Sequence, residues 1–279
     1  MKTIGILYIC TGKYDVFWED FYISFENYFL PNTEKHYFVF TDATYLYDEG
    51  KNPRIHKKMI GFEPWPLPTL LKYRTFLTFE SELAEMDYLY QSNANIICNE
   101  TITEEEFLPR EKDLFFNIHP GYMKRKPVDY PYDRNPASLA YVPYNKGKIY
   151  VFGAMNGGKS AAFIRMMKEV EARIEMDLKK GVIARWHDES HVNHYVATHT
   201  NYSIHSPAYC YPVGFDVDYP SKIAGVSKAD KFDVDELKGY QPSGKKTLFI
   251  KRLFTKLKNS TILVWLRMRD SILRKQIKE

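Results

Sequence analysis

The feature that most constrains the fold is an alternation of short apolar runs and longer amphipathic segments over the first 95 residues. The runs at residues 3–10, 36–41 and 87–91 are rich in β-branched and aromatic side chains, which is typical of buried strands. Between them, residues 14–29 and 70–86 carry apolar side chains at helical spacing. Strands that alternate with helices predict a parallel sheet of the α/β class, in which ligands bind beyond the carboxyl ends of the strands.

The same pattern continues farther along the chain. Residues 114–119 and 148–152 predict two further strands, and residues 160–180 predict a long helix that Gly181 ends. Two polar features interrupt the pattern. They are a glycine-rich stretch before the long helix and a dense ionisable cluster after it, and each can be explained in more than one way.

Composition excludes several classes of protein. The chain is 44% hydrophobic and 27% charged, which is globular and neither disordered nor fibrous. Cys10, Cys98 and Cys210 are far apart, which predicts neither a disulfide framework nor a metal cluster and favours the reducing cytoplasm. The apolar N-terminus lacks a small-residue cleavage site and is expected to be a strand. No apolar stretch reaches the roughly 18 to 20 residues that a membrane span needs.

The net charge of +4 hides two unlike parts. Residues 245–279 contain eleven Lys or Arg against two acidic residues, a net charge of +9, and the first 244 residues therefore carry −5. The chain is an acidic body with a basic tail, and the acidic body gives no reason to expect a nucleic-acid partner.

The stretch between Gly153 and Ser160 matches G-x-x-x-x-G-K-S/T, the pattern of a phosphate-binding P-loop, and has an expected strand before it and a helix after it. Two observations count against this interpretation. A P-loop follows the first strand of its sheet, and no apolar strand that ends in a magnesium-binding Asp is recognisable downstream. A nucleotide hydrolase stays an alternative. The other interpretation is a glycine-rich turn that lets the backbone approach a ligand closely.

The segment 187–191, His-Asp-Glu-Ser-His, is the densest ionisable cluster. Its two histidines, four residues apart, could share a helix face and bind zinc, although zinc proteases have Glu directly after the first His. A buried His–Asp pair with Ser190 as a cap is the structural alternative. The adjacent carboxylates of Asp188 and Glu189 also suit the stabilisation of an oxocarbenium-like centre in glycosyl transfer or hydrolysis.

Taken in order, the motifs of the body resemble glycosyltransferase family 6, the group that includes the ABO blood-group transferases and the α-1,3-galactosyltransferase. The resemblance covers about residues 3 to 235. The segments that carry it are "YICTGKY", "YFVFTD", "DYLYQSNAN", "NIHPGY", "YPYDRNPASLAYVP", "FGAMNGG", "WHDESHVNHY" and "SPAYCYP". It implies a GT-A fold, with a Rossmann-like mixed sheet flanked by helices. It also implies retaining transfer of galactose or N-acetylgalactosamine from a UDP-sugar, which forms an α-1,3 linkage. A lectin-like sugar-binding module is the non-enzymatic alternative.

The resemblance also implies roles for individual residues. The family's uridine pocket corresponds to Ile9, Cys10, Thr11 and Tyr14. Donor-sugar contacts correspond to Arg74, His187 and Asp188, and the positions that set donor choice to Phe152, Gly153 and Ala154. His119 and Trp186 correspond to acceptor contacts, and Glu189 to a residue that meets the acceptor and acts as nucleophile or as stabiliser of the transition state. Lys228 resembles the lysine that closes over the diphosphate, and Lys231 is expected to assist it.

One departure from the animal enzymes concerns the metal. They carry Asp-x-Asp, which binds manganese, where this chain has Asn93-Ala94-Asn95. Neutral amides are poor ligands for hard divalent ions. We therefore expect no metal and no other cofactor, with Asn93 and Asn95 on the donor side. The charge of the leaving group would be stabilised by Lys228, Lys231 and backbone donors.

The sequence constrains the donor sugar more than it constrains the acceptor. Ala154 beside bulky Phe152 narrows the donor pocket and favours galactose, with N-acetylgalactosamine as the second candidate because a family member with alanine at this position uses it. Pro131 and Pro212 replace polar acceptor contacts of the blood-group enzymes, so the need for a fucosylated acceptor stays open.

We expect a catalytic domain over residues 1–240 and a basic amphipathic tail over 241–279. The tail has apolar residues at helical spacing among its Lys and Arg side chains, with Trp265 near the middle. One interpretation is a helix that is solvated or packed on the body. The other is an interfacial helix on the anionic inner face of the cytoplasmic membrane, which would suit a lipid-linked glycan acceptor.

Overall fold

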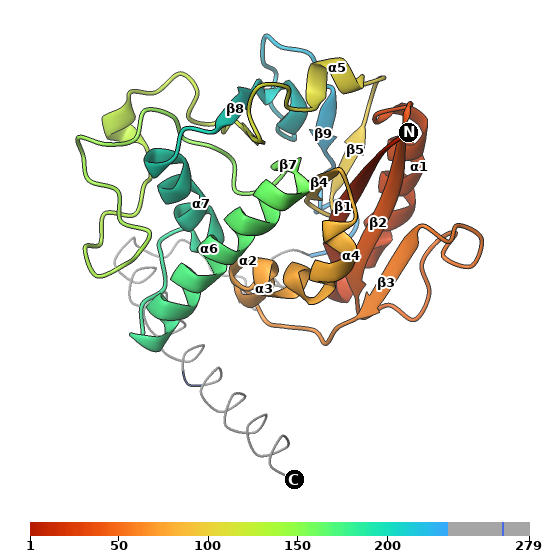
Figure 1. The fold of residues 1–279 in the computed structure, drawn as a ribbon, viewed down its shortest axis with the longest axis horizontal. Coiled ribbons are helices and arrows are strands. Elements are labelled where there is room, and N and C mark those ends of the chain that lie inside the picture. The colour runs from red at the N-terminus through yellow and green to blue at the C-terminus, as the bar shows by residue number, and fades with distance from the viewer. Residues whose placement is uncertain (234–263, 265–279) are drawn as a thin grey trace.

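The structure is a computed structural model that describes residues 1–233 and residue 264. Its centre is a seven-stranded mixed sheet in the order β3-β2-β1-β4-β7-β6-β8 (Figure 1). The strands of this sheet are β1 (Lys2–Cys10), β2 (Thr33–Thr41), β3 (Ile55–Met59), β4 (Tyr88–Ser92), β6 (Leu114–Asn117), β7 (Gly157–Lys159) and β8 (Tyr202–His205). A second sheet pairs β5 (Ile96–Cys98) with β9 (Ile223–Gly225). The expected α/β class is confirmed, and the arrangement is consistent with a GT-A-like fold.

The helices lie on both sides of the large sheet (Figure 1). They are α1 (Trp18–Tyr28), α2 (Leu67–Leu70), α3 (Lys72–Phe76), α4 (Glu80–Ala84), α5 (Glu104–Phe107), α6 (Ser160–Lys179) and α7 (His187–Thr198). Short 3-10 turns occupy Gly12–Phe17, Leu77–Phe79, Pro127–Asp129 and Pro207–Cys210. None of the helices among the described residues is both long and apolar enough to cross a membrane.

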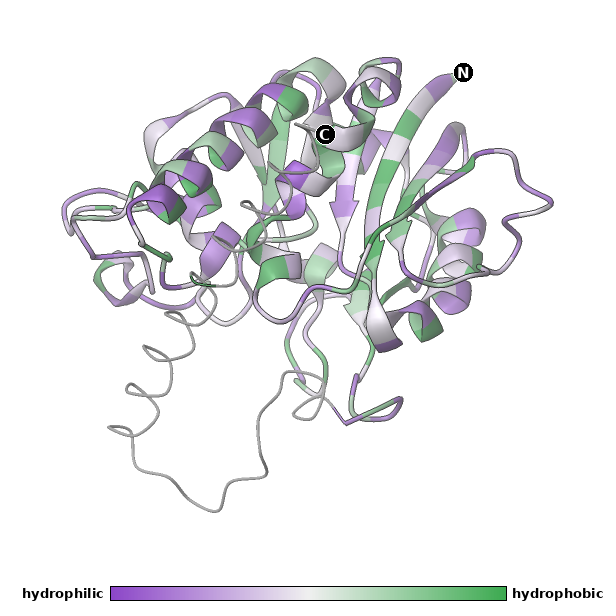
Figure 2. Ribbon diagram, turned by 90° about the horizontal axis from the view of Figure 1, so that it is seen from below, coloured by the Kyte–Doolittle hydropathy of each residue, from purple (hydrophilic) through white to green (hydrophobic). Residues whose placement is uncertain are grey.

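Strand β1 shows why the middle of the sheet is apolar throughout. Its side chains alternate between two core clusters: Ile6 and Tyr8 pack on the side of α1, and Leu7 packs on the side of α3, α4 and α6. A parallel strand that is covered on both faces must be hydrophobic at successive positions. Figure 2 shows these apolar strands at the centre of the molecule and more hydrophilic segments around them.

Several element predictions are confirmed, and others need correction. The first three predicted strands and the long helix are present as β1, β2, β4 and α6. The predicted helix 70–86 is broken, because Leu71 (φ −101°, ψ 12°) and Phe79 (φ −111°, ψ 23°) leave the helical region of backbone space. The predicted strand 148–152 contributes only an isolated bridge, between Val151 and Ile118. Its place in the sheet is taken by β7, which is antiparallel to both β4 and β6.

The carboxyl ends of the parallel strands determine where the candidate site lies. In the register of β1 with its neighbours, Cys10 pairs with Thr41 of β2 and Tyr8 with Ser92 of β4, so three strands end at one edge of the sheet. The loops that carry Thr11 and Asn93 leave from this edge. The expected boundary near residue 240 and the tail 241–279 fall outside the described residues, apart from residue 264, and both stay predictions.

Candidate active site

Two adjacent carboxylates at the start of α7 form the centre of the site. Asp188 is 1% exposed, and its Oδ2 lies 2.6 Å from Nζ of Lys72. The Lys72 ammonium also donates to the carbonyl oxygen of Gly153, at 2.6 Å, and is itself 8% exposed. A buried ion pair is stable only when further hydrogen bonds satisfy its charges, and the Gly153 carbonyl provides one. The second oxygen of Asp188, Oδ1, is buried without a hydrogen-bond partner.

Glu189 is held by two donors. The Tyr150 hydroxyl donates to its Oε1 at 2.7 Å, and the Gly153 backbone N–H donates to its Oε2 at 2.9 Å. Burial raises the pKa of Glu189 to about 7, although both hydrogen bonds act in the opposite direction. A carboxyl group with such a pKa changes its charge near neutral pH, which is common for groups that take part in catalysis.

Gly153 joins the two carboxylates through its backbone. Its N–H binds Glu189, and its carbonyl accepts from Lys72 and, at 3.0 Å, from the side-chain amide of Gln91. A Cβ at this position would lie 2.5 Å from Cβ of Glu189, so only glycine allows the approach. Ala154 follows as a buried residue, and Phe152 packs edge-on against His119 with ring centroids 5.4 Å apart. The predicted donor-choice segment therefore lies directly against the carboxylates.

A cavity of about 220 Å³ lies beside β1 and α3, and Ile9, Thr11 and Arg74 are among its lining residues. The predicted uridine-pocket residues Ile9 and Thr11 thus share one cavity. Cys10 packs in the core on the other face of β1, where burial raises the pKa of its thiol to about 12. Arg74 forms an ion pair with Glu171 at 2.7 Å, so in the structure Lys72, not Arg74, is the cation beside Asp188.

The segment after β9 closes against the first loop of the chain. Lys228 Nζ lies 5.1 Å from the centre of the Tyr14 ring, and Phe232 packs on the same ring with centroids 5.2 Å apart. The side-chain amide of Asn95 donates to the Val226 carbonyl at 2.7 Å. This brings Tyr14, Asn95 and Lys228 to one region.

Three further residues predicted for the site are Lys231, Asn93 and His187, and each lies in a different part of the structure. Lys231 pairs with Asp20 of α1 at 3.8 Å, which directs its ammonium toward that helix. Asn93 lies in the loop after β4, where its carbonyl accepts from the Ser92 hydroxyl at 2.9 Å. His187 is the first residue of α7, has a left-handed φ of 51°, and packs edge-on against Trp65.

The predicted acceptor residue His119 packs against Tyr150, which in turn binds Glu189. Burial lowers the pKa of His119 to about 4, so its imidazole is neutral, and its Nδ1 accepts the Gly121 N–H at 3.1 Å. Trp186 directly precedes α7 and is 44% exposed, with the Arg185 guanidinium 5.7 Å from the centre of its ring. Tyr150 packs near both His119 and Tyr122.

The P-loop interpretation is wrong. Residues 157–159 form β7 in the middle of the sheet, so no loop is left there to surround a phosphate. Lys159 pairs with Tyr88 at the amino end of β4, away from the site, and its ammonium binds Asp113 at 2.7 Å. The zinc interpretation gains no support either. His191 lies 3.7 Å from Asp177, and no cluster of His, Cys, Asp or Glu suited to a metal occurs among the described residues.

Sequence reasoning missed three residues of the site, Lys72, Tyr150 and Gln91. A lysine in an otherwise apolar amphipathic segment is a weak signal, since most lysines are solvated. Tyr150 and Gln91 lie in apolar runs, where polar groups need buried partners. Those partners, Glu189 and Gly153, are 39 and 62 residues away in the chain, so no local pattern indicates them.

Known proteins are similar in sequence to this chain. A family model for glycosyltransferase family 6 matches residues 72–232. The O-antigen biosynthesis glycosyltransferase WbnI of Escherichia coli is 39% identical over 69% of this chain and 81% of its own length. The globoside alpha-1,3-N-acetylgalactosaminyltransferase 1 of Mus musculus is 29% identical over 74% of this chain and 60% of its own length. The histo-blood group ABO system transferase 2 of Rattus norvegicus is 27% identical, with 74% and 63% covered.

Proposed function

Because the chain belongs to glycosyltransferase family 6, we propose that it is a retaining α-1,3-glycosyltransferase that uses a UDP-sugar. The donor sugar is galactose, with N-acetylgalactosamine as the less favoured alternative, and the acceptor is a galactoside of a bacterial surface glycan. The name of the Escherichia coli relative, an O-antigen biosynthesis enzyme, supports the class of acceptor.

The observation that carries the proposal is a pair of adjacent carboxylates, one buried and one half-buried, with separate partners. Glu189 is fixed by Tyr150 and Gly153, whereas Asp188 is fixed by Lys72. Two carboxylates in different surroundings can take different roles in glycosyl transfer. We assign Asp188 to a hydroxyl group of the donor sugar and Glu189 to the anomeric carbon.

Glu189 stabilises the developing positive charge at the anomeric carbon. As the bond between that carbon and the UDP oxygen breaks, its electron pair leaves with UDP, and the ionised carboxylate faces the oxocarbenium-like centre. The carboxylate either forms a transient covalent bond or acts only through its charge. Both alternatives need Glu189 in its ionised form. In either case the acceptor hydroxyl finally forms the new glycosidic bond and loses its proton to the departing diphosphate.

Transfer is proposed to be metal-independent. The residues at the position of the family's metal ligands are Asn93 and Asn95, and the amide of Asn95 is already bound to the Val226 carbonyl. Neutral amides without a carboxylate do not suit manganese. We assign the leaving diphosphate to Lys228, which the segment after β9 brings to Tyr14 in the proposed donor region.

The donor preference rests on Ala154, which is 8% exposed, and on the adjacent Phe152. An alanine methyl group and a phenyl ring leave less room for an acetamido group than glycine would.

A donor screen tests the whole proposal. UDP-galactose and UDP-N-acetylgalactosamine would each be incubated with plain and fucosylated galactosides, with and without EDTA, using wild-type protein and Glu189→Gln. We expect transfer from UDP-galactose that EDTA leaves unchanged and that Glu189→Gln abolishes. Loss with EDTA and recovery with manganese would overturn the metal-independent mechanism, and equal turnover of both donors would overturn the galactose preference. Absence of sugar transfer from either nucleotide would overturn the function.

A further inference from the structure

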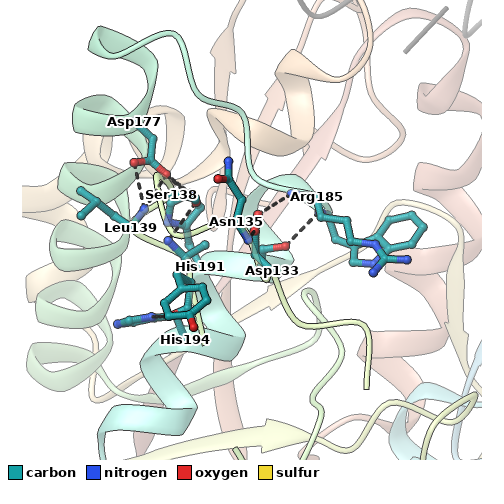
Figure 3. Close-up of polar contacts among 12 residues, drawn as sticks. Asp133, Asn135, Ser138, Leu139, Asp177, Arg185, His191 and His194 are labelled. Carbon is teal, nitrogen blue, oxygen red and sulfur yellow. Dashed lines mark hydrogen bonds and ion pairs between the residues drawn. The ribbon is translucent and has the colours of Figure 1, made fainter. Parts of the chain in front are cut away.

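Asp133 links the loop that follows it to the segment that carries Trp186, one of the predicted acceptor residues. It belongs to the long connection between Ile118 and Val151, and its side chain is 4% exposed. Its Oδ1 accepts the backbone N–H of Asn135 at 2.8 Å, and its Oδ2 accepts the backbone N–H of Arg185 at 2.8 Å. Figure 3 shows the carboxylate between these two partners. One buried carboxylate therefore ties its own loop to the segment that enters α7.

The segment entering α7 is fixed at three successive amides. The N–H of Arg185 binds Asp133, that of Trp186 binds the Ser190 hydroxyl at 2.9 Å, and that of His187 binds the Ala184 carbonyl at 3.0 Å. His187 also has a left-handed φ of 51°, a backbone angle that residues other than glycine seldom adopt without support from their surroundings. Of the three acceptors, only Asp133 comes from outside the segment and α7. Asp133 therefore links this segment directly to the loop 134–142, and His194 Nδ1, 2.8 Å from the Tyr141 carbonyl oxygen, links the same loop to α7 farther along the helix.

A second buried carboxylate holds the same loop to a different element. Asp177 of α6 is 1% exposed and accepts the Leu139 N–H at 2.9 Å and the Ser138 hydroxyl at 2.7 Å (Figure 3). It makes no hydrogen bond to residues 185–187. Asp177 therefore anchors the loop to α6 and also lies 3.7 Å from His191 of α7, whereas Asp133 connects the loop to the segment that carries Trp186.

We propose that Asp133 is a positioning residue for the acceptor: it sets the place of Trp186 relative to the loop 134–142. This inference rests on the proposed function. Glu189 and Asp188 have partners of their own in Tyr150, Gly153 and Lys72, so they do not depend on Asp133 for their positions. Loss of the Asp133 tie should then disturb the acceptor and leave donor chemistry intact.

Asp133→Asn is the test, with Asp177→Asn as the matched control. The asparagine keeps the shape, but its NH₂ group faces one of the two N–H donors, so one hydrogen bond is lost. We expect Asp133→Asn to raise the acceptor KM about tenfold, equivalent to about 1.4 kcal/mol. The donor KM and the slow hydrolysis of UDP-sugar without acceptor should stay within about twofold. Asp177→Asn should lower Tm and change the acceptor KM by less than about twofold. An equal rise in the acceptor KM for both variants would overturn the proposal, because general loosening of the loop would then be the cause.

Hydrogen exchange tests the tie independently of activity. In the wild-type protein, the amides of Asn135 and Arg185 should exchange slowly and with similar protection, because one carboxylate holds both. Asp133→Asn should increase exchange in both segments, and Asp177→Asn only around residues 138–139. Fast exchange of the Arg185 amide in the wild-type protein would overturn the proposal even if the asparagine variant failed to fold. An inactive wild-type enzyme with the expected exchange pattern would instead refute the proposed function and leave the tie in place.

Discussion

Glu189 is the residue whose chemistry depends most on its surroundings. Burial alone would keep its carboxyl group protonated, whereas the Tyr150 hydroxyl and the Gly153 N–H favour the charged form. The balance places its pKa at about 7, within reach of a small local change. The same two donors also fix its direction, so the geometry and the charge of this side chain have one origin.

The first prediction concerns the pH dependence of turnover. Since the proposed mechanism needs ionised Glu189, kcat/KM should fall about tenfold per unit as the pH drops below about 7 and should level off above it. Tyr150→Phe removes a hydrogen bond that lowers the pKa of Glu189, so its profile should shift to higher pH. Initial rates between pH 5 and 9 measure both. A midpoint that Tyr150→Phe leaves in place would argue against Glu189 as the titrating group.

The same pKa predicts an effect on stability. A carboxyl group whose pKa is raised in the folded state destabilises the protein as the pH rises from its unfolded pKa to its folded pKa, here from about 4.5 to about 7. Glu189→Gln removes this term. The variant should therefore gain stability relative to the wild type over this range, by about 3 kcal/mol at most. Urea unfolding at pH 4.5 and pH 8 measures the difference, and a difference that is the same at both pH values would contradict the prediction.

Lys72 offers a third prediction. Lys72→Met leaves the Asp188 carboxylate buried without its ion-pair partner, which typically costs about 3 to 5 kcal/mol of unfolding free energy. The double variant Lys72→Met, Asp188→Asn carries no buried charge and should recover part of that loss. Urea denaturation of the three proteins forms the comparison. If the single variant lost less stability than the double variant, the 2.6 Å contact would not be a stabilising pair.

At the scale of elements, β7 decides between two functions that the sequence left open. Lys159→Ala removes an ion pair at the amino end of β4, away from the site. Transferase activity should therefore stay within about twofold of wild type. Gly157→Ala should be far more harmful, because its Cβ would lie 2.2 Å from the Leu89 carbonyl oxygen in the neighbouring strand. Activity and thermal melts distinguish the two variants. Abolished activity in a folded Lys159→Ala protein would revive a phosphate-binding role.

Local periodicity predicted the elements that are buried over a long stretch. The runs of β1 and β2 and the amphipathic pattern of α6 each span enough residues to specify their structure. Strand β3, "IHKKM", has one buried position, and β7, "GGK", has no apolar side chain, so neither gives a periodic signal. They are strands because neighbouring strands supply their hydrogen-bond partners, and tertiary context of this kind overrides propensity.

The candidate site also contains residues that a local pattern predicts and residues that depend on tertiary context. The segment 186–189 and the segment 152–154 are recognisable from their motifs, and the structure brings them together. Lys72 was missed in favour of Arg74, two positions away, because only the broken helix at Leu71 determines which side chain faces Asp188. A motif specifies residue types, but the direction of a side chain depends on backbone geometry that the motif does not contain.

For the whole molecule, the charge split in the sequence predicts separate roles for the acidic body and the basic tail. The two large core clusters draw on residues between Ile4 and Ile223, and every proposed site residue lies before residue 232. The acidic body, with net charge −5, thus contains all that the proposed transfer needs. The basic residues beyond position 244 are not among the proposed site residues, and contact with a membrane that carries a lipid-linked acceptor stays a prediction for them.

The last prediction separates catalysis from membrane contact. A chain that ends at Gly239 should keep its kcat/KM on a soluble galactoside within about twofold, because every proposed site residue lies before residue 232. The full chain should sediment with vesicles of phosphatidylglycerol and phosphatidylethanolamine and be released by salt, since each Lys or Arg near an anionic surface contributes about 1 kcal/mol. Neutral phosphatidylcholine vesicles are the control. Trp265→Ser keeps every charge and should weaken binding only in part. If the shortened chain bound anionic vesicles as tightly as the full chain, the membrane contact would have to lie on the catalytic body.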